Sequence, residues 1–201
     1  MLTLKKVAIT GGLSSGKSTV CKIFQDLGAY TVSSDEIVHN ILSSNRTLQT
    51  QIIDLLGSDI LTNNLLDREK IAKKVFSDSE KLQALESLIH PAVFHEIQSQ
   101  YDSIKTDKRY ELFVAEVPLL YETSSQGLFD IIVTVLSDEN QSKERFKTMK
   151  NKSEAEFNHR MMRQLSPKEK AARADYIILN DGSIEELQSQ VTQLLSKLRS
   201  I

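Results

Sequence analysis

With 201 residues, the chain is long enough for one sizeable core with inserted subdomains, and its 40% hydrophobic and 26% charged residues are ordinary for a globular protein. A formal net charge of −2 gives no overall attraction to nucleic acid or to an anionic membrane, so any anion-binding site has to be local. One cysteine excludes an internal disulfide, and there is no charged-then-apolar leader and no run of about 18 apolar residues, so we expect a cytoplasmic protein with no nucleic-acid or membrane partner.

The first predicted element is a strand over residues 4–10, whose apolar centre suits a parallel strand buried on both faces. It runs into residues 11–18, Gly-Gly-Leu-Ser-Ser-Gly-Lys-Ser, which match the full phosphate-loop pattern G-x-x-x-x-G-K-[ST]. Residues 20–27 continue with apolar side chains at helical spacing. Strand, loop and helix therefore follow in the order that a phosphate-binding loop requires. A turn that only joined a strand to a helix would not need this loop pattern, so we reject that alternative.

Each residue type in this loop has a chemical reason. Gly11 and Gly16 allow backbone conformations that turn successive N–H groups toward phosphate oxygens at the start of the helix. Lys17 adds a positive charge for the β- and γ-phosphates, and the Ser18 hydroxyl is placed to ligate Mg²⁺. The sequence thus predicts a nucleoside triphosphate with Mg²⁺, held by Gly11, Gly12, Ser14, Ser15, Gly16, Lys17, Ser18 and Thr19.

Residues 28–35 come next, a helix stop at Gly28 followed by a short β-prone run that ends at the carboxylate of Asp35. In an open α/β sheet the side chains at the carboxyl ends of the strands face the ligand crevice, and the phosphate loop already marks that edge. Asp35 is therefore predicted to point toward the same site as Lys17. The same segment could instead open a helix with Asp35 acting only as its cap, since Ser and Asp are favoured at that position.

Residues 36–105 show repeated helical spacing and no convincing strand, so we expect a helical insertion between strands. Turn or breaker signals interrupt it at residues 43–45, 56–59 and 62–64 and at His90-Pro91. His90 precedes Pro91, a position that disfavours the α conformation, so its side chain is expected at a kink. A histidine there is more often a structural hydrogen-bonding group than a ligand.

Strand character returns at residues 110–120 and 130–136, whose near-continuous apolar runs suit strands buried on both faces. Glu116 stands at the carboxyl end of the first run. A carboxylate in that position is where such folds hold or orient the Mg²⁺ ion. The alternative is that Glu116 is an edge-exposed surface charge.

Residues 138–170 are charged and polar and include nine Lys or Arg residues. A basic helical pair with Ser153 as an N-cap between its arms is ordinarily a solvated surface, but beside a nucleotide site it can be a lid that closes arginines over the transferred phosphoryl group. A last strand over residues 174–179, a turn over 180–183 and an amphipathic helix over 184–198 complete the chain.

Several segments, in this order and spacing, resemble those of the dephospho-CoA kinase family over nearly the whole chain. The phosphate loop alone is shared by many NTPases, whereas Asp35, His90-Pro91, the Pro-Leu-Leu segment and the Ala-Asp/Asn-x-Gly ending are more specific. The segments that carry the resemblance are Ile9–Gly12 with Ser15–Thr19, Ser34–His39, Leu66–Arg68 with Val75-Phe76, Leu85-Glu86 with Ile89–Pro91, Val117–Glu122, Arg160 with Gln164, and Ala174–Ile177 with Asn180–Gly182.

The resemblance implies an α/β fold, namely a P-loop NTPase three-layer sandwich with a parallel sheet, a helical substrate-binding insertion and a helical lid. Residues 1–35, 106–137 and 171–201 would form the nucleotide-binding core, residues 36–105 the coenzyme A-binding domain and residues 138–170 the lid. The implied reaction transfers the γ-phosphoryl group of ATP to the ribose 3′-hydroxyl of dephospho-CoA, the final step of coenzyme A biosynthesis. We expect the protein to act as a monomer, with a weak oligomer as the alternative.

The implied residue roles fit this chemistry. An alcohol acceptor needs a carboxylate to accept its proton as the bond to phosphorus forms, which makes Asp35 the candidate base beside Lys17. The other implied site residues are Arg145 and Arg160 in the lid, His90, Pro91 and Leu119 at the substrate, Ser18 and Glu116 at the metal, and Asn180 and Gly182 at the adenine of ATP.

Two positions depart from the family pattern. Met149 stands four residues before Ser153, where sequences of this family often have arginine, so Arg145, Lys150 or Arg160 would supply the lid charge. Glu116 takes the place of an expected aspartate and keeps the acid one methylene longer.

Two other functions were compatible with the loop. Another small-molecule or nucleotide kinase would share the loop and lid but should lack the His-Pro and Pro-Leu-Leu segments. A nucleotide-dependent switch ATPase would need a guanine-specific element or an oligomer-facing arginine system. The sequence has neither an N-K-x-D-like segment nor a second basic surface outside residues 138–170.

Overall fold

The computed structural model describes residues 4–76, 78–148 and 153–200. The chain divides into two compact units, one formed by Met1–Ser33 with Ser103–Ile201 and the other by Ser34–Asp102. The first unit contains a parallel sheet with the phosphate loop, and the second is mainly helical.

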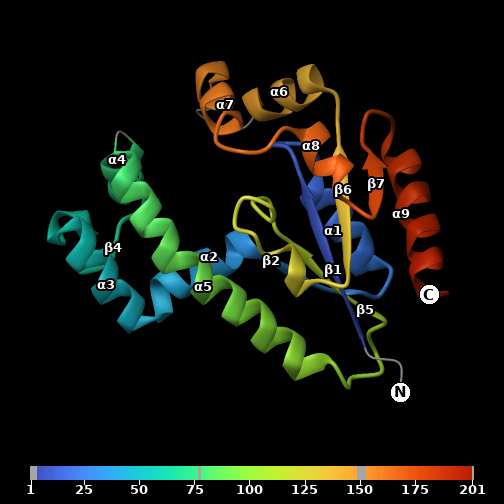
Figure 1. Ribbon diagram of the computed structural model, residues 1–201, viewed down its shortest axis with the longest axis horizontal. Coiled ribbons are helices and arrows are strands. Elements are labelled where there is room, and N and C mark those ends of the chain that lie inside the picture. Colours follow the sequence, from blue (N-terminus) through green and yellow to red (C-terminus); the bar gives the residue numbers. More distant parts are fainter. Residues whose placement is uncertain (1–3, 77, 149–152, 201) are drawn as a thin grey trace. The chain divides into compact units, whose positions relative to one another are not determined.

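The first unit is built on five parallel strands in the order β2-β5-β1-β6-β7 (Figure 1). Val7 of the first strand pairs with Val114 on one side and with Ile131 on the other, so β1 lies in the centre of the sheet. The predicted burial of this strand on both faces is confirmed, because Val7, Ala8 and Ile9 are all fully buried. The strand bounds are β1 Lys5–Gly11, β2 Tyr30–Ser33, β5 Leu112–Glu116, β6 Ile131–Leu136 and β7 Tyr176–Leu179.

Helices cover both faces of this sheet. On one face, Phe24 of α1 and Val191 of α9 share a buried core with Val133 of β6. On β6 the next residue, Thr134, donates its hydroxyl to the Lys170 carbonyl oxygen of α8 (3.3 Å), and neighbouring residues of a strand point to opposite faces. The predicted three-layer α/β arrangement is confirmed. The helices are α1 Lys17–Asp26, α6 Glu139–Lys147, α7 Glu154–Met161, α8 Pro167–Ala172 and α9 Ile184–Arg199, with a short 3₁₀ helix, η2, at Gln126–Leu128.

Strand β5 is shorter than the predicted run of residues 110–120. It ends at Glu116, and the chain then turns, with the Thr123 N–H donating to the Leu119 carbonyl oxygen (3.0 Å). Pro118 has no N–H to give to a ladder, which explains why the apolar run outlasts the strand. By contrast, the predicted N-cap at Ser153 is confirmed, since its hydroxyl accepts from the Glu156 N–H at 3.2 Å.

The second unit also contains a small hairpin, so the expectation of no strand in residues 36–105 is wrong. Strands β3 (Leu61–Thr62) and β4 (Leu65–Leu66) pair antiparallel. Asn63 and Asn64 between them have φ of 52° and 61°, as in a two-residue type I′ turn. Strands of two residues are too short to show a periodic pattern. The helices of this unit are α2 Ser34–Ser44, α3 Arg46–Leu56, α4 Arg68–Phe76 and α5 Ser79–Ile104, with a 3₁₀ helix, η1, at Ser58–Ile60.

Helix α5 runs through Pro91 without interruption, so the expected break at His90-Pro91 is also wrong. A proline inside a helix forfeits one N–H bond and crowds the preceding turn. Leu85, Val93 and Ile97 are buried on either side of it, and this continuous burial offsets the local cost. No described helix, α5 included, is long and apolar enough to cross a membrane.

Candidate active site

The phosphate loop connects β1 to α1 through a backbone that requires glycine. Gly11 and Gly16 have φ of 146° and 96°, a region that residues with a Cβ rarely adopt. The space beside them is also filled: a Cβ on Gly11 would overlap the Val135 carbonyl oxygen, and one on Gly16 would overlap the Asn180 side-chain amide. The loop therefore lies in close contact with β6 and with the residue that follows β7.

Two hydroxyl groups of this loop are buried and unpaired. Ser14 Oγ and Ser15 Oγ have no hydrogen-bond partner among the described residues, although leaving such a group unsatisfied costs about 1–3 kcal/mol. Gly16 holds the cap position of α1 and offers no side chain to the first turn, whose N–H groups have no partner inside the helix. An anion at this point would satisfy these donors, so the loop fits the phosphates of a nucleotide.

Lys17 lies over the loop rather than in solvent. The residue is 8% exposed, and its Nζ donates to the Gly12 carbonyl oxygen at 2.8 Å. This contact holds the ammonium group beside the glycine-rich turn. Its charge is therefore positioned where a phosphate bound by the loop would meet it.

Ser18 and Glu116 are hydrogen-bonded to each other. The Ser18 hydroxyl donates to Glu116 Oε1 at 2.9 Å. Glu116 is 9% exposed and lies opposite Ile9 of the central strand, so it is not the edge-exposed charge considered as the alternative. Hydroxyl and carboxylate oxygens suit Mg²⁺. No cluster of three or more His, Cys, Asp or Glu side chains could hold a metal within the described residues, so Mg²⁺ at this pair would keep water and phosphate oxygens as its other ligands.

Asp35 and His90 belong to the second unit. Asp35 is exposed and lies in the first turn of α2, which begins at Ser34, so it does not hold the cap position. It follows the last residue of β2, Ser33, by two positions. His90 is half-buried in α5, and this burial lowers its pKa while the nearby Glu86 raises it. The imidazole is thus favoured in its neutral form.

Arg145 is tied to the turn after β7. Its guanidinium donates to the Asn180 carbonyl oxygen (2.9 Å), to Ser137 Oγ (3.0 Å) and to Gln141 Oε1 (3.2 Å). Asn180 Nδ2 in turn donates to the Ser15 carbonyl oxygen at 2.8 Å. This series of contacts links α6 to the phosphate loop through the residue predicted to border the adenine.

Arg160 faces its own helix in the described arrangement. Its guanidinium pairs with Glu156 Oε1 at 2.7 Å and lies 5.9 Å from the centre of the Phe146 ring. The side chain is 47% exposed, so this ion pair contributes little to stability, and Arg160 can exchange Glu156 for another anion. Met149 and Lys150, the other predicted lid positions, lie outside the described residues.

The remaining predicted residues lie in less distinctive surroundings. Thr19 is exposed on α1, and Gly182 lies in the turn between β7 and α9. Leu119 is partly buried in the turn after β5, and Pro91 is exposed on α5.

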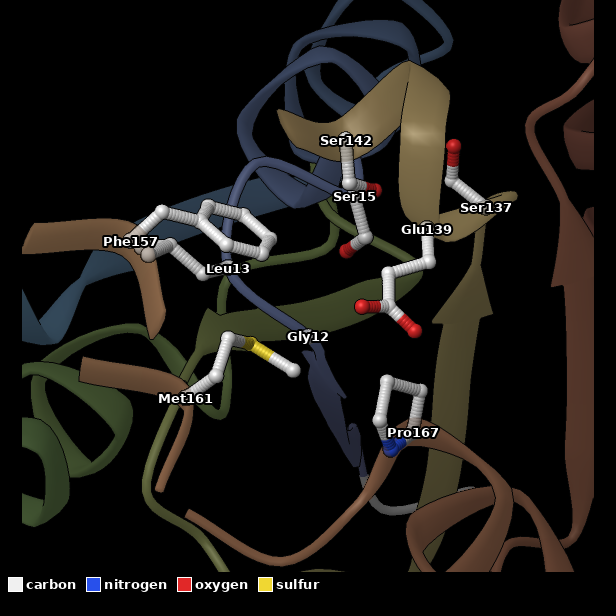
Figure 2. A pocket seen from close by; sticks show the side chains of 9 residues that line it. All are labelled: Gly12, Leu13, Ser15, Ser137, Glu139, Ser142, Phe157, Met161 and Pro167. Carbon is white, nitrogen blue, oxygen red and sulfur yellow. The ribbon is translucent and has the colours of Figure 1, made fainter. Parts of the chain in front are cut away.

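A cavity of about 50 Å³ lies between the phosphate loop and the helices α6 and α7 (Figure 2). Phe157 and Met161, one turn apart on α7, line it together with Pro167 at the start of α8. Figure 2 shows the Glu139 carboxylate pointing into the space beside the loop. The cavity has room for a few water molecules. The described residues of α6, α7 and the start of α8 therefore lie close to the loop, and sequence reasoning identified none of these four lining residues.

Comparison with known proteins identifies the family. A family model described as "Dephospho-CoA kinase" matches residues 5–186. The chain belongs to the dephospho-CoA kinase family. A dephospho-CoA kinase of Protochlamydia amoebophila is 50% identical over 200 residues, which cover 99% of this chain and 98% of that protein. The dephospho-CoA kinase of Chlamydia felis is 45% identical over 199 residues, with the same coverage.

Solved structures of other proteins share this fold. The crystal structure of TT1252 from Thermus thermophilus superposes with a TM-score of 0.83 and 26% identity, covering 98% of this chain and 99% of that one. A dephospho-CoA kinase from Campylobacter jejuni gives a TM-score of 0.72 with 24% identity, covering 97% of both chains. A shikimate kinase from Bacteroides thetaiotaomicron gives 0.57 with 14% identity, covering 98% and 99%, and likewise shares the fold.

Sequence reasoning missed the burial of Lys170, one of the nine basic residues of the segment 138–170. Its side chain is 0% exposed, and its ammonium group donates to the Pro118 carbonyl oxygen (2.6 Å) and to Gln164 Oε1 (3.4 Å) while pairing with Glu122 Oε1 (2.9 Å). The same carboxylate oxygen accepts from the Leu165 N–H at 2.8 Å. Burial lowers the pKa of Lys170, and the Glu122 carboxylate opposes this. Pro118 and Glu122 belong to a distant segment, so the local sequence gives no signal of the ion pair.

Proposed function

We propose that this protein transfers the γ-phosphoryl group of ATP to the ribose 3′-hydroxyl of dephospho-CoA. The observation that carries the proposal is the phosphate loop of a chain that belongs to the dephospho-CoA kinase family. Two buried hydroxyls of this loop have no hydrogen-bond partner among the described residues, Lys17 lies over the loop, and Ser18 is hydrogen-bonded to Glu116. The resemblance read from the sequence and the family of the relatives agree on this reaction.

The loop and its neighbours bind and orient the phosphates of ATP in this proposal. Ser14 and Ser15 donate their free hydroxyls, and the buried Lys17 ammonium offsets charge that develops on the β- and γ-phosphates. Ser18 and Glu116 would hold Mg²⁺, either directly or through water. When bound, the metal neutralises phosphate charge. Low exposure of Lys17 and Glu116 strengthens these electrostatic interactions.

Asp35 accepts the proton of the acceptor hydroxyl. A sugar hydroxyl is too weak an acid to ionise at neutral pH, so a carboxylate within hydrogen-bond reach is needed as the bond to phosphorus forms. Asp35 is exposed, lies two positions after the end of β2 and is not used as the N-cap of α2. It is therefore available for this role.

The other predicted residues complete the site. Arg145 and Arg160 stabilise the transferred phosphoryl group when the segment 138–170 closes, and Asn180 and Gly182 border the adenine. We place His90, Pro91 and Leu119 at the acceptor substrate. The link from Arg145 through Asn180 to Ser15 supports a nucleotide contact that reaches from α6 to the phosphate loop.

We also propose that the enzyme acts as a cytoplasmic monomer whose partner is the small-molecule substrate, without nucleic-acid or membrane binding. The net charge of −2 supports this, because it provides no general attraction to polyanionic surfaces.

A direct assay tests the function. The purified protein is incubated with ATP, Mg²⁺ and, in separate reactions, dephospho-CoA, adenosine, AMP or shikimate, and the phosphorylated product is identified by mass. Dephospho-CoA should be phosphorylated at the 3′-hydroxyl, and the others only weakly or not at all. Efficient phosphorylation of another acceptor would indicate a different kinase, and ATP hydrolysis with no acceptor phosphorylated would indicate a switch ATPase.

A further inference from the structure

Helix α2 of the second unit presents two functional side chains one turn apart. Asp35 and His39 are four residues apart, so they share one face of the helix, and both are exposed. Arg68, the first residue of α4, brings its Nη1 to 3.1 Å from the His39 Nδ1 atom. The guanidinium has no lone pair to offer, so the imidazole nitrogen is the acceptor in this contact.

The backbone that carries Arg68 is fixed by the preceding aspartate. The Asp67 carboxylate accepts from the N–H groups of Glu69 (3.0 Å) and Lys70 (3.2 Å), which caps the start of α4. Its other oxygen accepts from the Thr62 hydroxyl of the hairpin at 2.7 Å, and its own N–H donates to the Ile60 carbonyl oxygen at 2.9 Å. Arg68 therefore extends from an anchored helix end rather than from a free loop.

The charges of Arg68 and Asp35 do not neutralise each other. Within residues 4–76, 78–148 and 153–200, the Arg68 guanidinium contacts only His39, and the Asp35 carboxylate forms no ion pair. The imidazole uses one N–H of the guanidinium and leaves the remaining donors facing solvent. Arg68 has no carboxylate partner among these residues and is held by a histidine that lies one helical turn from the proposed base, which gives it the character of an anion-binding site.

We propose that Arg68, oriented by His39, binds the diphosphate of the acceptor substrate. This inference rests on the proposed function, in which Asp35 accepts the proton of the ribose 3′-hydroxyl. In dephospho-CoA one sugar ring separates that hydroxyl from the diphosphate, and four residues, about 6 Å along the axis of α2, separate Asp35 from His39. The planar guanidinium suits two phosphate oxygens at once. Arg68 and His39 thus position the ribose so that its 3′-hydroxyl lies beside the Asp35 carboxylate.

The test compares Arg68→Met with Arg46→Met. Arg46 is a matched control, because it is also the exposed first residue of a helix in the same unit. Arg68→Met should raise the KM for dephospho-CoA, and its Kd measured by calorimetry without ATP, by about 10- to 100-fold, since hydrogen bonds to charged groups are of that strength. The KM for ATP should stay within about twofold of the parent. Arg46→Met should change neither constant.

Two further variants separate binding from structure. Arg68→Lys keeps the positive charge but loses the planar set of donors of the guanidinium, so its KM for dephospho-CoA should lie between those of the parent and Arg68→Met. This variant also keeps the test informative where Arg68→Met folds poorly. His39→Phe should raise the same KM by a smaller factor. In the double variant His39→Phe/Arg68→Met this factor should vanish, because the histidine acts through the arginine.

Each outcome bears on one claim. An unchanged KM for dephospho-CoA in folded Arg68→Met, while the parent phosphorylates dephospho-CoA, overturns this inference and leaves the proposed function intact. A rise in the KM for ATP alone also overturns it, because the anion would then be the nucleotide phosphates. A parent protein that fails to phosphorylate dephospho-CoA would instead refute the proposed function itself.

Discussion

Replacing Lys170 by methionine should destabilise the sheet-bearing unit more than the loss of any exposed lysine. The ammonium group is fully buried, and the substitution leaves the Glu122 carboxylate without its cation and the Pro118 carbonyl without this donor. Removing one partner of a buried pair costs about 3–5 kcal/mol. The Glu122 side chain is 16% exposed and its Oε1 keeps the Leu165 N–H as a donor, so we expect the lower end of this range, about 3 kcal/mol.

Thermal unfolding followed by circular dichroism measures this loss. In a protein of this size about 3 kcal/mol corresponds to a fall in Tm of about 6–12 °C. The matched control is Lys147→Met, which removes an exposed lysine paired with Glu144 (3.0 Å) and Glu154 (3.1 Å). Such surface pairs contribute about 0–1 kcal/mol, so the control should melt within about 2–4 °C of the parent.

The double variant Lys170→Met/Glu122→Gln isolates the unpaired charge. The glutamine keeps an oxygen for the Leu165 N–H but carries no charge, so the double variant should regain part of the lost stability. Equal melting temperatures for Lys170→Met and Lys147→Met would refute the reasoning, because the buried pair would then contribute no more than an exposed one.

Four other perturbations test the site and the second unit. Lys17→Ala should lower turnover by at least about a hundredfold with little change in Tm, and near-normal turnover would contradict its role at the phosphates. Asp35→Asn should lower turnover by about 10²- to 10⁴-fold while calorimetry shows ATP affinity within about threefold of the parent, and unchanged turnover would exclude Asp35 as the base. Arg145→Ala should depress turnover with little change in helical content by circular dichroism, and a large loss of helix with normal turnover would make the residue structural. Hydrogen bonds from Thr62 and from backbone N–H groups lower the pKa of Asp67. The stability that this carboxylate contributes is therefore present above the ordinary aspartate pKa of about 4 and is lost as pH falls through the lower folded-state pKa. Between about pH 7 and pH 3, Asp67→Asn should lose less stability than the parent in thermal melts, and an equal loss would contradict the stabilising role of the Asp67 carboxylate.

The predictions that succeeded depend on short-range patterns. The phosphate loop is defined by spacing within eight residues, and it is flanked by the expected strand β1 and helix α1. The position of Glu116 at the carboxyl end of a strand also followed from the sequence, since an apolar run leads up to it. The roles of Asp35, Arg145 and the other candidate site residues stay predictions until they are measured.

The predictions that failed depend on contacts between distant segments or on very short elements. Lys170 looks like a surface residue because its partners Pro118 and Glu122 are about 50 positions away. The hairpin β3–β4 contains too few residues to show alternation, although its two asparagines marked the turn. Pro91 favoured a break in α5, and only the buried residues on both sides explain why the helix continues.

The position of β1 in the sheet has a consequence for synthesis on the ribosome. This strand and the phosphate loop are made first, yet the two strands that flank β1 are residues 112–116 and 131–136, and the amide that contacts Ser15 belongs to Asn180. The nucleotide-binding loop therefore leaves the ribosome long before its supporting strands do. Folding of this unit must await nearly the whole chain, as expected for a sheet dominated by long-range contacts. Nascent chains that end before β6 should bind no nucleotide, and during translation the apolar β1 depends on later strands, or on a chaperone, to cover it.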